Sequence, residues 1–323
     1  MVGWHIPSRV AIAALPSRVA TAALLALVAL DVALVAVALR STHTSGIDTS
    51  PVGTASASTA PGSISPTTAP VNPSSTTSVT AAKAPLQTML VAFDSQHAWR
   101  VAAGSCSSGG ATLATTADGG KTWAKRNAKL RRIVRLGPKG IRAAFVVGAN
   151  SSCAAELKDT SDGGDTWNSG GYVGAAWFRD LRNTKVVHAP GPATVRPCGK
   201  HDVLDLAVLT AGSARVLCAD GLVRLTTNNG AVWTDVGTVD GAVALAVQTV
   251  KPGETYVARL GAPDCAGVQI LQVHPQNAVS CVQAAIPKGP GQIAVSLVKG
   301  GGWLAVGDTT LLSTDGLVTW RVA

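Results

Sequence analysis

The hydrophobic and polar positions divide the chain into three parts. An apolar run extends from Val19 to Leu39 and is interrupted only by Asp31. It is long enough for a helix to cross a membrane, which needs about 20 residues. Residues 41–84 consist almost entirely of Ser, Thr, Pro, Ala, Gly and Val. From Leu86 onward, short β-branched or alternating runs recur between turn residues, a pattern typical of β strands.

The charges around the apolar run predict its orientation. Arg9 and Arg18 precede it, and no basic residue lies between Arg40 and Lys83. The positive-inside bias therefore predicts a cytoplasmic segment at 1–18, a transmembrane signal anchor at 19–39 and an extracytoplasmic remainder. The alternative is a signal peptide cleaved near residue 38, which makes the protein secreted. The length of the apolar run favours the anchor, because signal-peptide cores span about 7–15 residues.

The segment 40–85 is predicted to be a disordered extracytoplasmic linker. Its composition offers too little apolar surface to offset the entropy of ordering the chain. The globular part of the protein is therefore predicted to be residues 86–323.

This globular part contains an internal repeat of the form [ST]-x-[DN]-x-G-x-x-W. Copies occupy residues 116–123, 160–167 and 226–233, and a fourth with Leu at the Gly position occupies 313–320. An Asp or Asn side chain in such a turn accepts nearby backbone N–H groups, Gly adopts positive φ, and Trp packs as the next strand begins. We therefore expect these residues to be structural rather than catalytic: Asp118, Trp123, Asp162, Trp167, Asn228, Trp233, Asp315 and Trp320.

The spacing of the repeats predicts an all-β fold, a β-propeller. The distance from Trp123 to Trp167 is close to one four-stranded blade of about 40–45 residues. We assign the longer gap before Trp233 to a loop around residues 177–198. The gap before Trp320 is expected to contain a worn copy at 274–281. This count gives about five four-stranded blades, or six if the long loop hides another.

The repeats resemble the Asp-box, or BNR, repeats of β-propeller families over residues 86–323. The resemblance is to the photosystem II assembly and stability factor group and, more distantly, to sialidases and sortilin-type receptors. Asn228 in the third copy and Leu317 at the second Gly position of the fourth depart from the family pattern. The resemblance implies a propeller, and by analogy with the assembly factors a binding scaffold.

Six cysteines follow the apolar run and have no metal-type spacing, so disulfides in an oxidising compartment are expected. The blade layout favours short connections between or within neighbouring blades. The expected pairs are Cys106 with Cys153, Cys198 with Cys218, and Cys265 with Cys281.

A sialidase-like glycoside hydrolase is the enzymatic alternative, since the resemblance implies a Tyr nucleophile and an arginine cluster in that family. The chain has only Tyr172 and Tyr256, and we interpret Arg179 and Arg182 as the polar face of a loop. No nucleophile elbow, P-loop or HExxH motif is present. We therefore expect no catalysis and no cofactor or metal.

The chain carries 27 Lys and Arg against 18 Asp and Glu, a net charge of +9. No acid interrupts the basic run from residue 121 to 142. Its alternation predicts an exposed stripe that includes Lys129, Arg131, Arg132 and Arg135, with an anionic lipid or nucleic acid as an alternative ligand. The main expectation is a monomeric, membrane-anchored, extracytoplasmic scaffold that binds a protein or a cell-envelope polymer and not nucleic acid.

Overall fold

The computed structural model describes residues 83–247 and 253–323. The expected cytoplasmic segment, the anchor and nearly all of the linker lie outside these residues. Within the described ranges, no helix is both long and apolar enough to cross a membrane.

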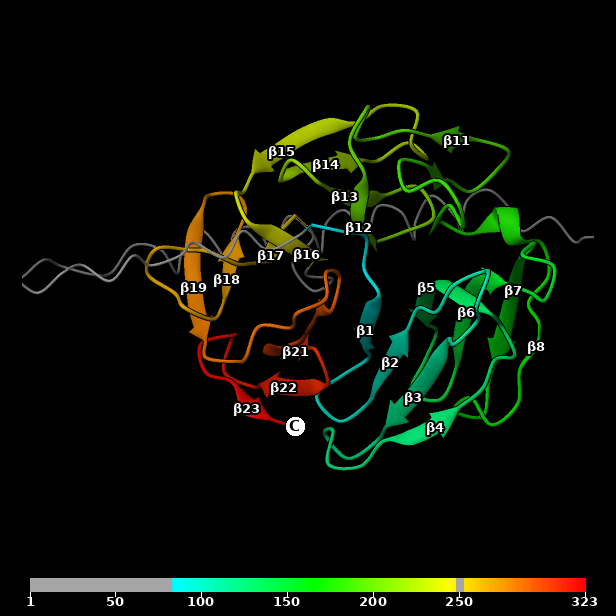
Figure 1. Ribbon diagram of the computed structural model, residues 1–323, viewed down its shortest axis with the longest axis horizontal. Helices are drawn as coiled ribbons and strands as arrows, with labels where there is room; N and C mark the ends of the chain where they lie inside the picture. Colours follow the sequence, from blue (N-terminus) through cyan, green and yellow to red (C-terminus); the bar gives the residue numbers. More distant parts are fainter. Residues whose placement is uncertain (1–82, 248–252) are drawn as a thin grey trace, which may run out of the picture. The chain divides into compact units, whose positions relative to one another are not determined.

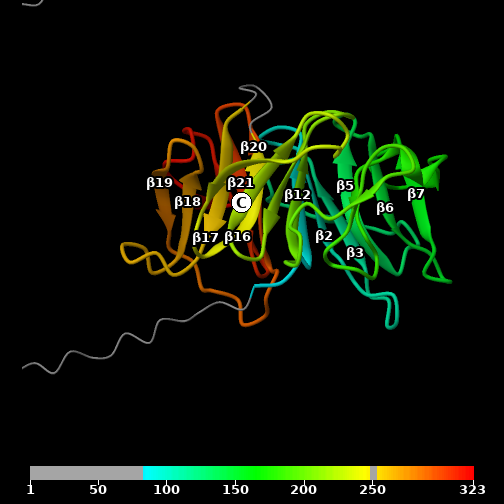
Figure 2. The same ribbon diagram turned by 90° about the horizontal axis from the view of Figure 1, so that it is seen from above.

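The described residues form a six-bladed β-propeller of antiparallel sheets placed around a ring (Figure 1, and from above in Figure 2). Strands follow one another in chain order within every sheet. The first sheet contains β1 (Thr88–Ala92), β2 (Ala98–Ala102), β3 (Thr112–Thr116) and β4 (Ala124–Arg126). The second contains β5 (Arg132–Pro138), β6 (Ala144–Ala149), β7 (Ala155–Thr160) and β8 (Asn168–Ser169). The third contains β9 (Phe178–Arg179), β10 (Val187–His188) and β11 (Thr194–Val195), preceded by the 3₁₀ turn η1 (Val173–Ala175).

The remaining three sheets each have four strands. The fourth sheet contains β12 (Val203–Val208), β13 (Ala214–Cys218), β14 (Leu222–Thr226) and β15 (Thr234–Thr238). The fifth contains β16 (Ala242–Val247), β17 (Thr255–Arg259), β18 (Val268–Gln272) and β19 (Asn277–Val282). The sixth contains β20 (Ile293–Val298), β21 (Gly301–Val306), β22 (Thr309–Ser313) and β23 (Arg321–Val322).

Burial explains which sequences occupy the inner and outer strands. The inner strands β16 and β20 are apolar almost throughout, because neighbouring sheets cover both of their faces. The outermost strands β4, β8 and β23 are short and mostly exposed. A short outer strand offers little unpaired backbone for edge-to-edge association.

The structure has six blades, the alternative that the sequence analysis left open, rather than about five. The stretch 177–198, expected to be a loop, contains the third sheet. Its strands have only two residues each and no Asp box, so no periodic signal marks them. Trp177 lies immediately before β9, whereas Trp99 and Trp303 lie in the second strands of their sheets. We infer that β9, β10 and β11 correspond to strands two to four, and that residues 170–177 replace an innermost strand.

The four boxes share one hydrogen-bond pattern. In the first, Asp118 Oδ1 accepts the hydroxyl of Thr116 at 2.8 Å and the backbone N–H of Thr122 at 3.0 Å. Thr116 Oγ1 accepts the N–H of Gly120 at 3.0 Å. The same bonds recur around Asp162, Asn228 and Asp315. The box residues therefore hold the turn between the third and fourth strands.

Box tryptophans join neighbouring sheets. Trp167 meets Trp99, Trp233 meets Trp177, and Trp123 meets Trp303, each edge to face with ring centroids 6.1–6.3 Å apart. Gly120 has φ of 91°, and a Cβ there would lie 2.5 Å from Ala323 Cβ and 3.1 Å from the Trp303 ring. The glycine is therefore required by the close approach of Ala323 as well as by the turn.

The fourth box shows how Leu317 replaces the second glycine. Leu317 keeps a positive φ of 75° and is buried. Leu317 packs in the same hydrophobic cluster as Ala258 and Ile270 of the fifth sheet. The fifth sheet contains no tryptophan, and we infer that this leaves room for the leucine side chain.

The expected box at 274–281 is wrong. β18 and β19 are joined by the four-residue turn 273–276, and Cys281 lies within β19 opposite Gln269. A tight turn has replaced the box, so no residue takes the tryptophan position.

The cysteines form three disulfides, Cys106–Cys153, Cys198–Cys218 and Cys265–Cys281, and leave none free. These are the pairs that the sequence analysis expects. The first links the β2–β3 and β6–β7 connections of adjacent sheets, the second links the third sheet to the fourth, and the last lies within the fifth sheet.

Candidate functional site

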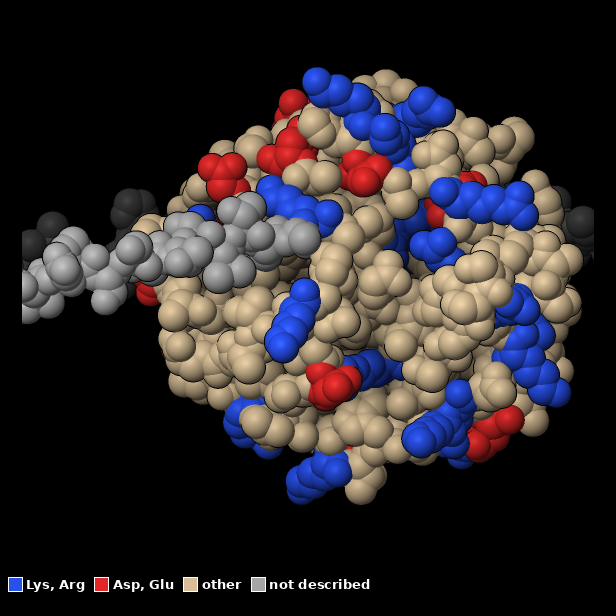
Figure 3. Space-filling view, in the orientation of Figure 1, with Lys and Arg blue, Asp and Glu red and all other residues tan. Residues whose placement is uncertain are grey.

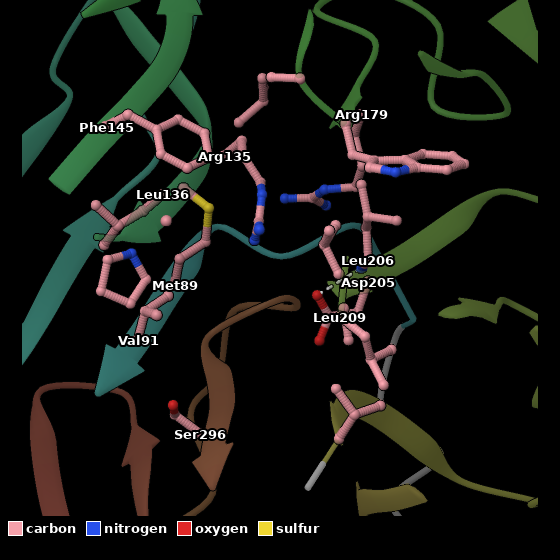
Figure 4. Close-up of a pocket in the computed structure, with 18 of the residues that line it drawn as sticks. Met89, Val91, Arg135, Leu136, Phe145, Arg179, Asp205, Leu206, Leu209 and Ser296 are labelled. Atoms are coloured by element: carbon pink, nitrogen blue, oxygen red, sulfur yellow. Dashed lines mark hydrogen bonds between the residues drawn. The ribbon is translucent and has the colours of Figure 1, made fainter. Parts of the chain in front are cut away.

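A cavity of about 710 Å³ lies among the innermost strands of the ring (Figure 4). It is lined by β1, β5, β12, β16 and β20, and on the side of the third sheet by residues between Gly170 and Arg179. Most of the lining residues are aliphatic. Three charged residues among them converge from different sheets: Arg135, Arg179 and Asp205 (Figure 4).

Arg135 comes from β5 and reaches into the cavity (Figure 4). Its guanidinium lies 5.8 Å from the centre of the Phe145 ring, a cation–π contact. Its Nε atom is buried without a hydrogen-bond partner. Burial lowers the pKa of Arg135 to about 10, and the nearby Asp205 carboxylate opposes that shift. At neutral pH the side chain is therefore a cation whose donors are free.

Arg179 from β9 is held in place by backbone carbonyls. Its Nη1 donates to Leu204 O at 3.0 Å and its Nη2 donates to Leu86 O at 3.2 Å. Burial lowers its pKa, while Asp205 acts in the opposite direction. These two bonds tie the third sheet to the start of β12 and to the chain just before β1.

Asp205 is the counter-charge of both arginines. Its carboxylate accepts the backbone N–H of Leu206 at 2.7 Å and of Leu245 at 2.8 Å. Burial raises its pKa, and the charges of Arg179 and Arg135 and these two hydrogen bonds act against the rise. Two cations face at most one anion, so the group has a surplus of positive charge. An uncompensated charge in a partly desolvated cavity favours an anionic occupant.

Other polar groups line the same space. Ser296 Oγ accepts the N–H of Ala92 at 2.9 Å, so its own hydroxyl proton remains available to donate. Lys139 is paired with Asp159 at 2.7 Å. Tyr172 lines the cavity and is 70% exposed. The cavity therefore offers donors rather than acceptors to a ligand.

The predicted exposed stripe of basic residues is wrong. Only Lys129 of the four is fully exposed. Arg131 Nε donates to Cys106 O at 2.7 Å, Arg132 Nη1 donates to Leu181 O at 2.6 Å, and Arg135 lines the cavity. The physical reason is that β5 is the innermost strand of its sheet and faces the cavity, whereas the prediction assumed a solvent-exposed outer edge. Figure 3 shows Lys and Arg scattered over one face rather than gathered in a band.

The interpretation of Arg179 as part of a polar loop face is also wrong. Arg179 is only 7% exposed and belongs to a strand, whereas Arg182 is exposed in the connection after β9. Sequence reasoning missed Asp205 altogether. Its one signal is an acid within the apolar run Val203–Val208.

The two tyrosines are separated. Tyr256 donates to Glu254 at 2.9 Å, and burial with this acid raises the pKa of Tyr256 to about 12. Neither of these residues lines the cavity, and Asp205 is the one carboxylate among the described lining residues. Within 83–247 and 253–323, no group of three or more His, Cys, Asp or Glu is placed to bind a metal.

Comparison with known proteins finds only distant similarities to solved structures. No family model matches the chain, and no curated protein matches it. A solved glycoside hydrolase family 74 enzyme from Niastella koreensis is 14% identical, with a TM-score of 0.40, over 72% of this chain and 46% of its own. The chain thus spans about half of that enzyme.

Two other similar structures are complexes with ligands. YCF48 bound to D1 peptide is 18% identical, with a TM-score of 0.28, over 75% of this chain and 83% of its own. The SapL1 lectin in complex with alpha methyl fucoside is 12% identical, with a TM-score of 0.48, over 76% of this chain and 98% of its own. Since these TM-scores are below 0.5, the similarities assign no function to this chain.

Proposed function

We propose that this protein is a non-enzymatic binding scaffold whose central cavity receives an anionic group of a protein or polymer ligand. The observation that carries the proposal is Arg135, a cation on an innermost strand with unused donors. A carboxylate or phosphate would supply both the missing hydrogen bonds and the missing charge.

The sialidase-like hydrolase receives less support from the cavity. Glycoside hydrolysis by the common mechanisms needs two carboxyl groups about 5–10 Å apart. Asp205 alone is available among the described lining residues, and two backbone N–H groups and two arginines already engage it. The sialidase variant needs a tyrosine activated by an acid, but the Tyr256–Glu254 pair lies outside the cavity lining.

We further propose that the propeller is held outside the cytoplasm by a membrane anchor at residues 19–39. Three intrachain disulfides support an oxidising compartment. A reporter that is active only outside the cytoplasm, fused after Ala323, tests this placement. Inactivity of the fusion would argue against it.

The binding proposal is tested by calorimetric titration of the full chain with polyglutamate and with polygalacturonate, an acidic peptide and an acidic polysaccharide. We expect the wild type to bind at least one of them. Arg135→Gln should weaken that binding about 10-fold or more, because a hydrogen bond to a charged group contributes about 1.5–3 kcal/mol.

Lys125→Gln is the matched control. Lys125 is exposed on the outermost strand β4 and its loss changes the net charge by the same amount. Equal weakening by both variants would show that binding depends on overall charge and not on the cavity. Failure of the wild type to bind either polymer would overturn the proposal.

A further inference from the structure

The exposed hydrophobic side chains of the described residues are unevenly placed. Six large ones are exposed: Phe93, Ile141, Tyr172, Val232, Val318 and Val322. Val232 and Val318 lie within boxes, and Val322 lies in β23. Phe93 and Ile141 lie in turns of the first and second sheets, and Tyr172 lies in the segment that leads into the third.

Phe93 and Ile141 lie on the same face of the propeller as the boxes, here called the box face. Phe93 begins the β1–β2 turn, whose Gln96 carbonyl accepts the N–H of Gly119 in the first box at 3.1 Å. Ile141 lies in the β5–β6 turn, whose Arg142 carbonyl accepts the N–H of Gly163 in the second box at 2.8 Å. Each turn is thus fixed by a box.

Phe93 and Ile141 closely follow residues that line the cavity, and Tyr172 lines it directly. Ala92, which precedes Phe93, and Lys139, two residues before Ile141, both line the cavity, as does Tyr172. We call Phe93, Ile141 and Tyr172 the rim. The rim is apolar, whereas the cavity beyond it presents the free guanidinium of Arg135.

We propose that a protein partner docks on the box face, with apolar side chains against the rim and an acidic group directed into the cavity towards Arg135. This inference rests on the proposed function and specifies the class of ligand. The surplus of positive charge in the cavity indicates that the ligand carries an acidic group. The apolar rim indicates that apolar side chains of the partner surround this group.

The chemistry of the rim favours a protein over a polysaccharide. Ile141 offers branched aliphatic surface at the rim, which packs against apolar side chains. A sugar chain covering the same surface would lose water from hydroxyl groups without gaining hydrogen bonds. Flat aromatic surface, on which sugar rings stack, comes only from Phe93 and Tyr172.

The position of the Arg135 guanidinium indicates where the acidic group would bind. The guanidinium lies 5.8 Å from the centre of the Phe145 ring, and Lys139 Nζ lies 5.6 Å from the same ring. Phe145 pairs with Gly137, next to the end of β5. The acidic group of the partner should therefore enter at this end of β5.

The test is selection of a displayed library of random peptides on the full chain, followed by titration of the most enriched peptide. We expect enriched peptides to combine an acidic group with apolar residues. The triple variant Phe93→Ser, Ile141→Ser, Tyr172→Ser should bind the peptide about 10-fold or more weakly, as expected when apolar anchors are removed. Val322→Ser, an exposed apolar residue away from the rim, is the control and should bind as the wild type does.

The outcomes separate this inference from the proposed function. If the rim variant keeps full peptide affinity while Arg135→Gln loses it, the docking surface is wrong and the cavity proposal stands. If no peptide is enriched and polygalacturonate binds through Arg135, the partner is a polysaccharide and the docking proposal is overturned. All variants should first show unchanged thermal unfolding, since the rim side chains are exposed.

Discussion

Trp123 and Trp303 meet edge to face, with ring centroids 6.3 Å apart and an angle of 81° between their planes. This contact joins the first sheet to the sixth and so closes the ring. It is accompanied by a hydrogen bond from Trp303 Nε1 to Asp94 O at 2.9 Å and by another from Arg100 Nη1 to Asp308 O at 2.8 Å. The junction between the two ends of the propeller thus combines side-chain contacts with two backbone hydrogen bonds, from the N–H groups of Gln87 and Thr88 to Gly291 O.

Trp303→Ala is expected to lower the free energy of unfolding by about 3–5 kcal/mol, because it removes a fully buried large aromatic. Trp123→Ala should cost less, since Trp123 is only partly buried. In a double-mutant cycle measured by denaturant unfolding, the pair should couple by about 0.5–1.5 kcal/mol. The control is a second double-mutant cycle with Trp320→Ala and Trp303→Ala. Coupling of equal size in this control would contradict a specific contact between Trp123 and Trp303.

The box acids should make stability depend on acid pH. Hydrogen bonds from Thr122 lower the pKa of Asp118 to about 2, and those from Thr319 lower the pKa of Asp315 to about 2. A carboxyl whose pKa falls on folding stabilises the protein above its unfolded pKa of about 3.9. That contribution should be lost as the pH falls from about 4 through 2.

The measurement is the melting temperature between pH 5 and pH 2 for the wild type and for Asp118→Asn. The variant should be less stable at pH 5 and should lose less stability on acidification. Parallel curves for the two proteins would show that Asp118 gains no stabilisation from ionisation.

Asp205→Asn should destabilise the propeller by about 3–5 kcal/mol, the usual cost of leaving a buried charge without its partner. The change leaves Arg179 and Arg135 without a counter-charge. Adding Arg135→Gln should recover part of the loss, because it removes one of the two cations. Denaturant unfolding of the single and double variants measures both effects, and additive losses would contradict the electrostatic link.

Each disulfide should contribute to the free energy of unfolding, and the contribution should increase with the length of chain that the disulfide encloses. Cys106–Cys153 separates its cysteines by 47 residues and Cys265–Cys281 by 16. In the chain-entropy view, removing them costs about 4 and 3 kcal/mol respectively. Double Ser variants of each pair, compared by urea unfolding, test the size and the order of these losses.

The sequence predicted the fold through the boxes because their chemistry is local. Thr116, Asp118, Gly120 and Trp123 act within one turn, so the pattern can be read without knowing the rest of the molecule. The third sheet escaped prediction for the opposite reason. Its two-residue strands depend on neighbouring sheets for their order, and neither periodicity nor a turn motif marks them.

The candidate site could be predicted only in part. Arg135 was singled out as a member of a basic run, but its alternating neighbours gave no sign that β5 lies innermost. Arg179 and Asp205 come from two other sheets, and only ring closure brings them to the same cavity (Figure 4). Such a site depends on contacts between distant segments and leaves no local motif.

The closing of the ring has a mechanical consequence. Each sheet is built from one continuous stretch of chain, and no strand crosses from the sixth sheet to the first. The seam is held by the edge-to-face indoles, the Arg100 contacts and two backbone hydrogen bonds from Gln87 and Thr88 to Gly291. Because β1 and β20 border the cavity on that side, widening the cavity at the seam would break these contacts but no strand pairing within a blade.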